Sequence, residues 1–307
     1  MNAEAATVAA AVLLAALLDR ALPEPADRWH PVAWLGRAGA TLGRFALAAR
    51  TPRAQLARGV LAWALLALPV TAVAFWLERA LGALPAAAQA PVLALALKPT
   101  FAWRLLREEV AAVEAALAQS VDAARAQVAR ICSRDVAALD EAGVRETALE
   151  SLAENFNDSL VAPLLWYAAA GLAGAVLYRV ANTLDAMWGY RGRWEWAGKC
   201  AARADDVLSW LPARLSALLL APPRRWRQLR AQAARTPSPN GGWPMAALAL
   251  RLGVRLRKPG VYALNDAARA PAGADTARAL AFTGRAAMAA FALAAAAAAA
   301  RAHGLAG

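Results

Sequence analysis

Cysteine and histidine are almost absent from this chain of 307 residues. The only cysteines are Cys132 and Cys200, the only histidines are His30 and His303, and their spacing matches no metal-binding motif. A zinc site of the usual kind takes cysteine and histidine ligands at short, fixed spacings, so the ligand count excludes one here. The two cysteines are most simply reduced thiols that lie on the cytoplasmic side or in the protein interior.

A phosphate-binding loop of the Walker type is also missing. The nearest candidate, the stretch GRWEWAGK at 192–199, has five residues between its glycines where the motif has four. Its tryptophans stand where the backbone of such a loop must wrap around phosphate. If the chain binds ATP, it therefore does so by another arrangement.

The first apolar stretch, at 5–18, lacks the features of a cleavable signal peptide. It follows Glu4 with no Lys or Arg before it, and Asp19 and Arg20 stand where a small-residue cleavage site should lie. We interpret it as a helix that stays in the chain.

Apolar sequence is what the chain has in abundance, since 60% of its residues are hydrophobic. About 20 mostly apolar residues span a bilayer as a helix, and the clearest stretches of that kind are 59–77 and 160–178. Four others are shorter or carry a charge, at 5–18, 83–97, 207–221 and 286–300. We predict an all-α fold: a multi-pass integral membrane helical bundle with four to six embedded helices and polar helical loops, in a single domain over 1–307.

Basic residues outnumber acidic ones and give the chain a net charge of +12. In a membrane protein such an excess most often reflects Lys- and Arg-rich cytoplasmic loops. Attraction to anionic headgroups or to phosphorylated substrates would add to it. No compact basic stripe interleaved with aromatic residues is visible in a soluble domain, so we expect no nucleic-acid partner.

A row of four carboxylates stands just before the apolar stretch at 160–178. On a helix these residues form one acidic face beside a face for packing. A solvated acidic surface is the plain interpretation of such a row. Asn155, Asn157 and Ser159 interleave with the acids, however, and carboxylate and amide oxygens are the ligands that suit Mg²⁺. The row consists of Glu146, Glu150, Glu154 and Asp158.

A second polar stretch, at 178–215, mixes acids and bases. It contains Asp185 and the adjacent pair Asp205 and Asp206. Carboxylates that hold a metal, together with Arg or Lys that neutralises phosphate oxygens, are what phosphoryl chemistry requires. A charge at a helix N-terminus is the alternative for the Asp pair. The surrounding cations are Arg179, Arg191, Arg193, Lys199, Arg203 and Arg214.

Tryptophan is frequent, with twelve in the chain. Four of them, Trp188, Trp194, Trp196 and Trp243, lie in the polar loops beside the charges. A large flat ligand could stack on them, and anchoring at the membrane interface explains them equally well.

Six motifs in order give the chain a family resemblance. They are HPVAWLG (30–36), SRD (133–135), ETALESLAENFNDSLVAPLLWY (146–167), NTLDAMWGYR (182–191), ARADDVLSWLPARL (202–215) and SPNGGWP (238–244). Over nearly its full length the chain resembles the membrane-bound adenosylcobinamide-phosphate synthases of cobalamin biosynthesis, the CobD/CbiB family. The resemblance implies an ATP- and Mg²⁺-dependent enzyme that joins adenosylcobyric acid to aminopropanol, or to its O-phosphate, as an amide.

The matched motifs also suggest which residues form the site, and leave Glu146 as helix surface. Catalytic roles are expected for Glu150, Glu154, Asn155, Asp158, Asp185, Arg203, Asp205 and Asp206. Binding of substrate or phosphate is expected at His30, Arg134, Asp135, Asn182, Lys199, Arg214 and Asn240. The expected metal ligands are Glu154, Asp158, Asp205 and Asp206.

One topological problem follows. If 160–178 crossed the membrane once, the acidic row and the Asp205–Asp206 pair would face opposite sides, whereas ATP is present on only one. We therefore expect this segment to fold back, with Pro163, Gly171 and Gly174 as the candidate breaks.

The expected setting is the inner cell membrane, with the active-site loops facing the cytoplasm. Besides its substrates and the bilayer, the candidate partners are a second copy of the chain and other membrane enzymes late in the cobalamin pathway. The alternative functions are a membrane transporter that relays cations through buried carboxylates, and a regulatory or sensor protein on the same fold. The position of most acids in loops favours the enzyme.

Overall fold

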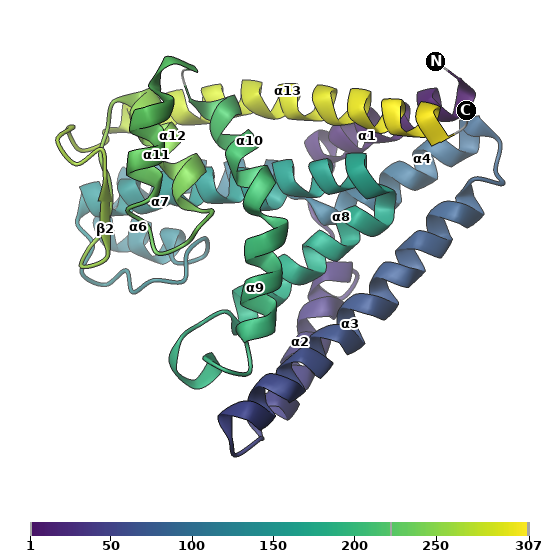
Figure 1. Ribbon diagram of the computed structural model, residues 1–307. Helices are drawn as coiled ribbons and strands as arrows, with labels where there is room; N and C mark the ends of the chain where they lie inside the picture. The colour runs from purple at the N-terminus through teal and green to yellow at the C-terminus, as the bar shows by residue number, and fades with distance from the viewer. Residues whose placement is uncertain (1, 222, 306–307) are drawn as a thin grey trace. The chain divides into compact units, whose positions relative to one another are not determined.

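The computed structural model describes residues 2–221 and 223–305, and these are predominantly helical, as predicted (Figure 1). The chain divides into two compact units. The first takes in the chain as far as Ala102, the segment Ala162–Leu208 and the chain from Phe291 on. The second consists of Trp103–Val161 and Ser209–Ala290. The predicted single domain over the whole chain stays a prediction.

The first unit is built from long helices that begin at recognisable caps. Before α2 the His30 ring accepts a hydrogen bond from the backbone N–H of Val32, and before α3 the Thr51 hydroxyl accepts one from Ala54. A proline follows each cap at the first helical position, where it costs no hydrogen bond. The elements of this unit are α1 (Ala3–Ala21), α2 (Pro31–Leu47), α3 (Pro52–Leu81), α4 (Ala86–Leu97), η1 (Lys98–Thr100), α8 (Ala162–Trp188), η3 (Gly192–Trp194) and α9 (Lys199–Leu208).

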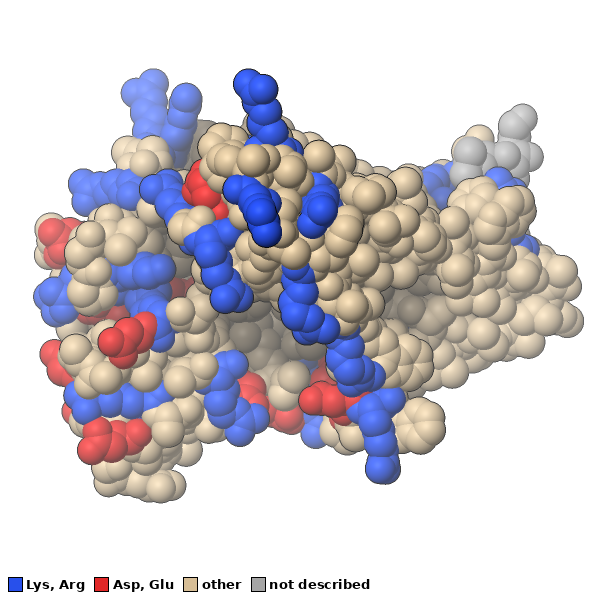
Figure 2. All heavy atoms as spheres, turned by 90° about the horizontal axis from the view of Figure 1, so that it is seen from below, with Lys and Arg blue, Asp and Glu red and all other residues tan. Residues whose placement is uncertain are grey.

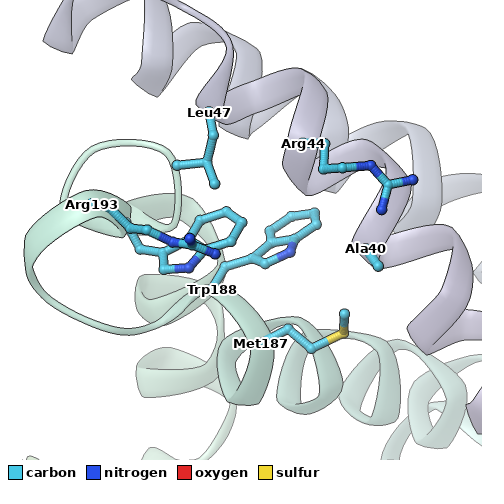
Figure 3. A pocket seen from close by; sticks show the side chains of 7 residues that line it. Ala40, Arg44, Leu47, Met187, Trp188 and Arg193 are labelled. Atoms are coloured by element: carbon cyan, nitrogen blue, oxygen red, sulfur yellow. The ribbon is translucent and has the colours of Figure 1, made fainter.

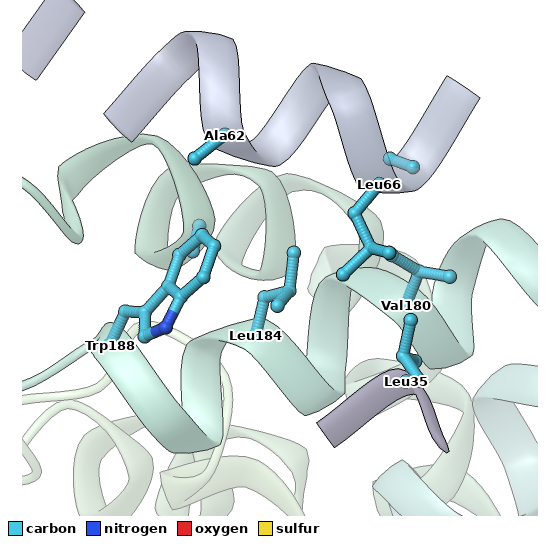
Figure 4. Packing of buried hydrophobic residues seen from close by; sticks show 8 residues of the cluster. Leu35, Ala62, Leu66, Val180, Leu184 and Trp188 are labelled. Carbon is cyan, nitrogen blue, oxygen red and sulfur yellow. The ribbon is translucent and has the colours of Figure 1, made fainter. Parts of the chain in front are cut away.

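A buried cluster holds α2, α3, α8 and α9 together. Figure 4 shows Leu66 of α3 facing Val180 and Leu184 of α8, with Leu35 of α2 beside them. Trp188, at the end of α8, closes the cluster and is 1% exposed. Burial of each large apolar side chain stabilises the fold by about 1.5–3 kcal/mol. This packing therefore fixes the C-terminal half of α8, which carries Asn182 and Asp185.

Helix α8 is broken in its middle. Ala170 and Gly171 have non-helical backbone angles, and Gly171 has φ 66° and ψ −157°, a conformation that favours glycine. A Cβ on Gly174 would overlap the carbonyl of Trp166, although a straight helix would place residues eight apart about 12 Å from each other along its axis. The two arms therefore run in different directions, as Figure 1 shows, and the predicted break at Gly171 is confirmed.

A carboxylate from α3 holds this break. Oε2 of Glu78 accepts a hydrogen bond from the backbone N–H of Leu172 at 2.8 Å, so it caps the first free donor of the second arm. Arg301 of α13 lies 3.8 Å from the other oxygen of Glu78. The turn is thus fixed by side chains from two other helices.

The second unit is made of shorter helices and one small β-hairpin. In the hairpin Leu256 pairs with Leu264 and Lys258 with Tyr262, in antiparallel register. The elements are α5 (Trp103–Leu117), α6 (Val121–Val128), α7 (Glu141–Phe156), the π-helical turn η2 (Asn157–Val161), α10 (Trp210–Leu220), η4 (Pro223–Arg225), α11 (Trp226–Ala233), α12 (Gly242–Leu252), β1 (Leu256–Lys258) and β2 (Tyr262–Leu264). Helix α13 (Gly273–Leu305) begins in this unit and ends in the first.

Within the described residues, three helical stretches are long and apolar enough to cross a membrane: Pro52–Leu81, Glu141–Trp188 and Gly273–Gly304. This is fewer than the four to six predicted. Two of the six apolar stretches form helices that are too short, because α4 has 12 residues and α10 has 11. The stretch at 286–300, in contrast, lies within a helix of 33 residues.

Candidate functional site

The acidic row on α7 begins with a buried ion-pair cluster. Glu146 is 1% exposed, and its two oxygens accept hydrogen bonds from Arg255 at 3.0 Å and Arg257 at 3.1 Å, on either side of the first residue of β1. The interpretation of Glu146 as helix surface is wrong. Spacing within the helix could not reveal partners more than a hundred residues later in the chain. This carboxylate secures the β-hairpin to α7.

Glu150 is the next acid in the row and is also 1% exposed. Its Oε2 accepts a hydrogen bond of 2.6 Å from Arg134, which also donates to the hydroxyl of Thr147 and the carbonyl of Arg257. Burial alone would lower the pKa of the Arg134 guanidinium, but the Glu150 carboxylate outweighs it and raises that pKa. Arg134, predicted to bind phosphate, therefore holds Glu150 in place in the structure.

Tyr262 of β2 completes this cluster. Its hydroxyl lies 3.6 Å from the sulfur of Met245 and beside the Glu150 carboxylate. Burial and the negative charge of Glu150 both raise the pKa of Tyr262, so the phenol stays protonated. Arg134 thus orients Glu150 through its Oε2, while Oε1 is buried and accepts no hydrogen bond from the described residues.

Glu154 differs from the two acids before it because it is exposed. Its Oε1 lies 3.1 Å from the position of a Cβ on Gly241, in the loop before α12. The hydroxyl of Ser238 shapes that loop by accepting hydrogen bonds from the backbone N–H groups of Asn240 and Gly241. The acidic motif and the SPNGGWP motif therefore meet at Glu154, the exposed acid of the row.

The row ends in a turn of π-helix, Asn157–Val161. The Asn157 side chain donates to Oδ1 of Asp158 at 2.7 Å and accepts from Ser216 of α10 at 3.0 Å. Asn155 instead donates to the carbonyl of Ser151 one turn back. Such π-helical turns are frequent at functional sites because they redirect side chains, and this one orients Asp158.

Arg214 of α10 is tied to the same loop. It donates to Oδ1 of Asn240 at 2.5 Å and to the carbonyl of Pro239, and its guanidinium lies over the rings of Trp210 and Trp243, at 4.7 and 4.8 Å from their centroids. Planar stacking of this kind is specific to arginine. Arg214 and Asn240, both predicted to bind substrate or phosphate, therefore hold the loop beside Glu154.

Asp135 serves the backbone in the structure. It is exposed, and its Oδ1 accepts a hydrogen bond from Ala137 two residues on, as in an Asx turn. A role for it in binding substrate stays a prediction.

The other predicted carboxylates lie in the first unit. Arg179 donates to Oδ1 of Asn182 at 3.4 Å, and Asn182 donates to Oδ1 of Asp205 at 3.3 Å. Asp185 follows one turn later on α8, where its carboxylate lies against Gly189. The structure thus brings the NTLDAMWGYR and ARADDVLSWLPARL motifs together between α8 and α9.

Asp206 and Lys199 have weaker partners. Arg203 lies 3.5 Å from Asp206 and is largely exposed. Burial raises the pKa of Asp206, and Arg203 offsets part of that rise. Lys199 contacts Glu195 at 3.3 Å and lies over the ring of Trp196. These are surface contacts of about 0–1 kcal/mol, so an anionic ligand could displace them.

His30 belongs to a network that the sequence did not suggest. Its Nε2 lies 3.3 Å from Oε2 of Glu24, whose other oxygen accepts a 2.5 Å hydrogen bond from Lys98. Lys98 also contacts Asp19 of α1 at 3.2 Å. Besides capping α2, His30 therefore helps to connect α1, α2 and η1, and its predicted role near the substrate stays a prediction.

Two of the four tryptophans in the polar loops contact each other. Trp188 and Trp194 stack on each other, with centroids 6.1 Å apart and planes 14° apart. Figure 3 shows the cavity beside them, of about 310 Å³, with Leu47 and Met187 on either side of the indole rings. Because Trp188 is buried, it offers no open face to a ligand.

The oxygen donors of the site fit Mg²⁺, which is commonly held by one or two carboxylates together with substrate phosphates. Glu154 and Asp158 supply one such pair in the second unit, and Asp205 and Asp206 supply another in the first. Within either unit, as far as residues 2–221 and 223–305 show, no three Asp, Glu, His or Cys side chains could hold a metal by themselves. A metal site shared by the two pairs stays a prediction.

Comparison with known proteins decides the family. The sequence profile described as "CobD/Cbib protein" matches residues 12–294. The chain belongs to the CobD/Cbib family. No solved structure matches it.

Among CobD relatives, the "Probable cobalamin biosynthesis protein CobD" of Thermococcus kodakarensis is 41% identical over 276 residues, which cover 87% of this chain and 88% of the relative. The "Cobalamin biosynthesis protein CobD" of Chromobacterium violaceum is 44% identical over 254 residues, 79% of each chain. That of Rhodobacter capsulatus is 41% identical over 308 residues, with 91% and 93% covered. The family resemblance drawn from the six motifs is confirmed.

Proposed function

We propose that the chain is a membrane enzyme of cobalamin biosynthesis that forms an amide between adenosylcobyric acid and aminopropanol, or its O-phosphate, at the expense of ATP. Membership of the CobD/Cbib family and the names of its relatives support the pathway. One observation supports the site most directly: Glu154, the exposed acid of the row, lies against the Ser238–Gly241 loop. Because Glu154 is exposed, we infer that substrate approaches the row at this carboxylate.

The chemistry requires activation, because a carboxylate is a poor acyl donor. In the first step an oxygen of the substrate carboxylate attacks a phosphorus of ATP, which forms an acyl phosphate and releases the remaining nucleotide. In the second step the amine nitrogen attacks the acyl carbon, the C–O bond to phosphate breaks, and the nitrogen loses a proton. Mg²⁺, when bound, neutralises phosphate oxygens through both steps.

The protein's part is positioning and charge neutralisation. Glu154, Asp158, Asp205 and Asp206 are the carboxylates that we propose as metal ligands. Lys199 and Arg203, whose contacts are exposed, would bind phosphate oxygens. Glu150 and Arg214 are already held by the protein, so they would orient the groups that touch substrate.

We infer that the enzyme lies in the inner membrane, and use of ATP would require these loops to face the cytoplasm. A cation relay through the spans is less well supported. The carboxylate of Glu78, in α3, is engaged by Leu172 and Arg301 and caps the break in α8. Such a carboxylate has a structural task, which leaves it poorly suited to carry ions.

The test is reconstitution of the purified chain with adenosylcobyric acid, aminopropanol phosphate, ATP and Mg²⁺, with product mass analysis. We expect an amide product that depends on ATP. Glu154→Gln should reduce its rate at least about 100-fold, as expected for loss of a group that stabilises developing charge. Glu108→Gln, which removes an exposed carboxylate on α5, is the matched control and should keep the wild-type rate. A folded preparation that makes no ATP-dependent amide overturns the proposal.

A further inference from the structure

Acidic residues are absent from a long part of the chain. Between Asp206 and Asp266 there is no Asp or Glu, while ten residues are Lys or Arg. Figure 2 shows Lys and Arg side chains gathered on one face of the molecule, with fewer acids among them. So much charge of one sign in one segment must be neutralised by distant groups of the chain or by something outside it.

Part of this charge is used by the protein. Arg255 and Arg257 pair with Glu146, Arg214 binds Asn240, and Arg235 donates to the carbonyl of Ala263. Four other arginines make no hydrogen bond or ion pair within residues 2–221 and 223–305, and all four are exposed. They are Arg224, Arg225, Arg227 and Arg230.

These four arginines, here called the α11 basic surface, lie on η4 and on one side of α11. The opposite side of that helix buries Leu229 and Ala233. Arg224, Arg227 and Arg230 are three residues apart, so they follow one stripe of the helix surface. Packing therefore fixes α11 with its cations directed away from the protein.

One aromatic residue accompanies the stripe. Trp226 is 39% exposed, and its ring packs against that of Trp243 at 5.1 Å. Tryptophan in this half-exposed state is typical of the membrane–water interface, where its ring lies at the level of the headgroups. The apolar helix α10 ends at Leu220, so the basic surface begins only a few residues beyond a membrane-like segment.

We propose that the α11 basic surface binds the phosphate groups of anionic lipids at the surface of the membrane. Four unpaired guanidinium groups within seven residues, beside an interfacial tryptophan, match the charge of such headgroups. The surface is separate from the carboxylates proposed for catalysis, so the inference does not depend on the proposed reaction.

The test uses the full chain in zwitterionic detergent micelles titrated with short-chain phosphatidylglycerol, with phosphatidylcholine of equal chain length as the uncharged comparison. Each arginine near an anionic membrane is worth about a fivefold change in affinity. Arg227→Gln/Arg230→Gln should therefore bind phosphatidylglycerol about 25-fold more weakly, with phosphatidylcholine binding unchanged. High salt should reduce the wild-type affinity in the same way.

The matched control is Arg191→Gln/Arg193→Gln, which removes two exposed arginines from a loop of the first unit. It should keep the wild-type affinity for phosphatidylglycerol. An equal loss in this control would show that net charge alone attracts the lipid, and would overturn the assignment to α11. Equal competition by inorganic phosphate, or tighter binding of a single-stranded oligonucleotide, would overturn it in favour of a general anion site or a nucleic-acid surface.

Discussion

Gly171→Ala should be among the most damaging single-methyl substitutions in the chain. The residue has φ 66° and ψ −157°, and an alanine held there costs about 1–3 kcal/mol in backbone strain. Its new Cβ would also overlap Oε2 of Glu78, which accepts the Leu172 N–H. Displacing that carboxylate removes a charge-assisted hydrogen bond worth about 1.5–3 kcal/mol. We therefore expect a loss of about 3–5 kcal/mol in the free energy of unfolding.

Equilibrium unfolding in mixed micelles with increasing sodium dodecyl sulfate measures this loss. Gly36→Ala is the matched control, because a Cβ on Gly36 meets no atom within 4 Å and the position is helical. It should be neutral or stabilising by up to about 1 kcal/mol.

A double-mutant cycle tests the cause. If the new methyl group acts partly by displacing Glu78, then Glu78→Ala should relieve part of its cost. The two losses should fall short of additivity by at least about 1 kcal/mol. Strictly additive losses, or a Gly171→Ala variant as stable as Gly36→Ala, would refute the idea that Glu78 caps the break in α8.

Three further predictions concern other sites. Glu146→Gln should lower the free energy of unfolding by about 3 kcal/mol, because it weakens two charge-assisted hydrogen bonds in a buried site. A protease should then cleave the β-hairpin at a lower urea concentration than in the wild type, and unchanged cleavage would contradict the prediction. Gly241→Ala should lower kcat and leave stability unchanged, since its methyl group would press on Glu154 at 3.1 Å; an unaltered rate would count against that contact. Burial alone would raise the pKa of Glu24, but hydrogen bonds from His30 and Lys98 outweigh it and lower that pKa. The contribution of Glu24 to stability is therefore present above its unfolded pKa of about 4.3 and is lost as pH falls through its lower folded pKa. In Glu24→Gln the free energy of unfolding should therefore change less with pH over this range.

The fold class and the break in α8 could be predicted from local sequence. Apolar length predicts helices in a membrane. Gly171 lies inside an apolar stretch between two motifs that the proposed reaction would require on the same side of the bilayer. Helix length was less predictable. The apolar stretches at 83–97 and 207–221, the second of which includes Arg214, contain the short helices α4 and α10, because apolar sequence does not by itself set where a helix begins and ends.

The sequence predicted which residues form the candidate site, and the structure shows that residues of the same type have different contacts and exposure. Glu146, Glu150 and Glu154 have the same spacing and the same chemistry, yet the first two are buried against arginines and the third is exposed. That difference arises from Arg134 and the arginines flanking Leu256, whose approach to α7 is a matter of tertiary packing. The two arginines on either side of Leu256 were the available signal.

The contacts of Glu78 and Glu24 were not anticipated for a related reason. Each carboxylate pairs with groups more than fifty residues away in sequence, Leu172 for Glu78 and Lys98 for Glu24. In sequence, charges near the ends of apolar stretches are typical of helix boundaries and loops. Only the folded chain shows that Glu78 caps a second helix and Glu24 joins a network.

The most direct measurement follows the oxygen of the substrate carboxylate. Adenosylcobyric acid labelled with ¹⁸O in the reacting carboxylate is incubated with the purified chain, aminopropanol phosphate, ATP and Mg²⁺, and the amide and released phosphate are analysed by mass spectrometry. Activation as an acyl phosphate predicts one ¹⁸O in phosphate for each amide formed, and loss of both products in Glu154→Gln but not in Glu108→Gln. Amide formation with unlabelled phosphate, or wild-type turnover by Glu154→Gln, would contradict the proposed chemistry and the proposed site.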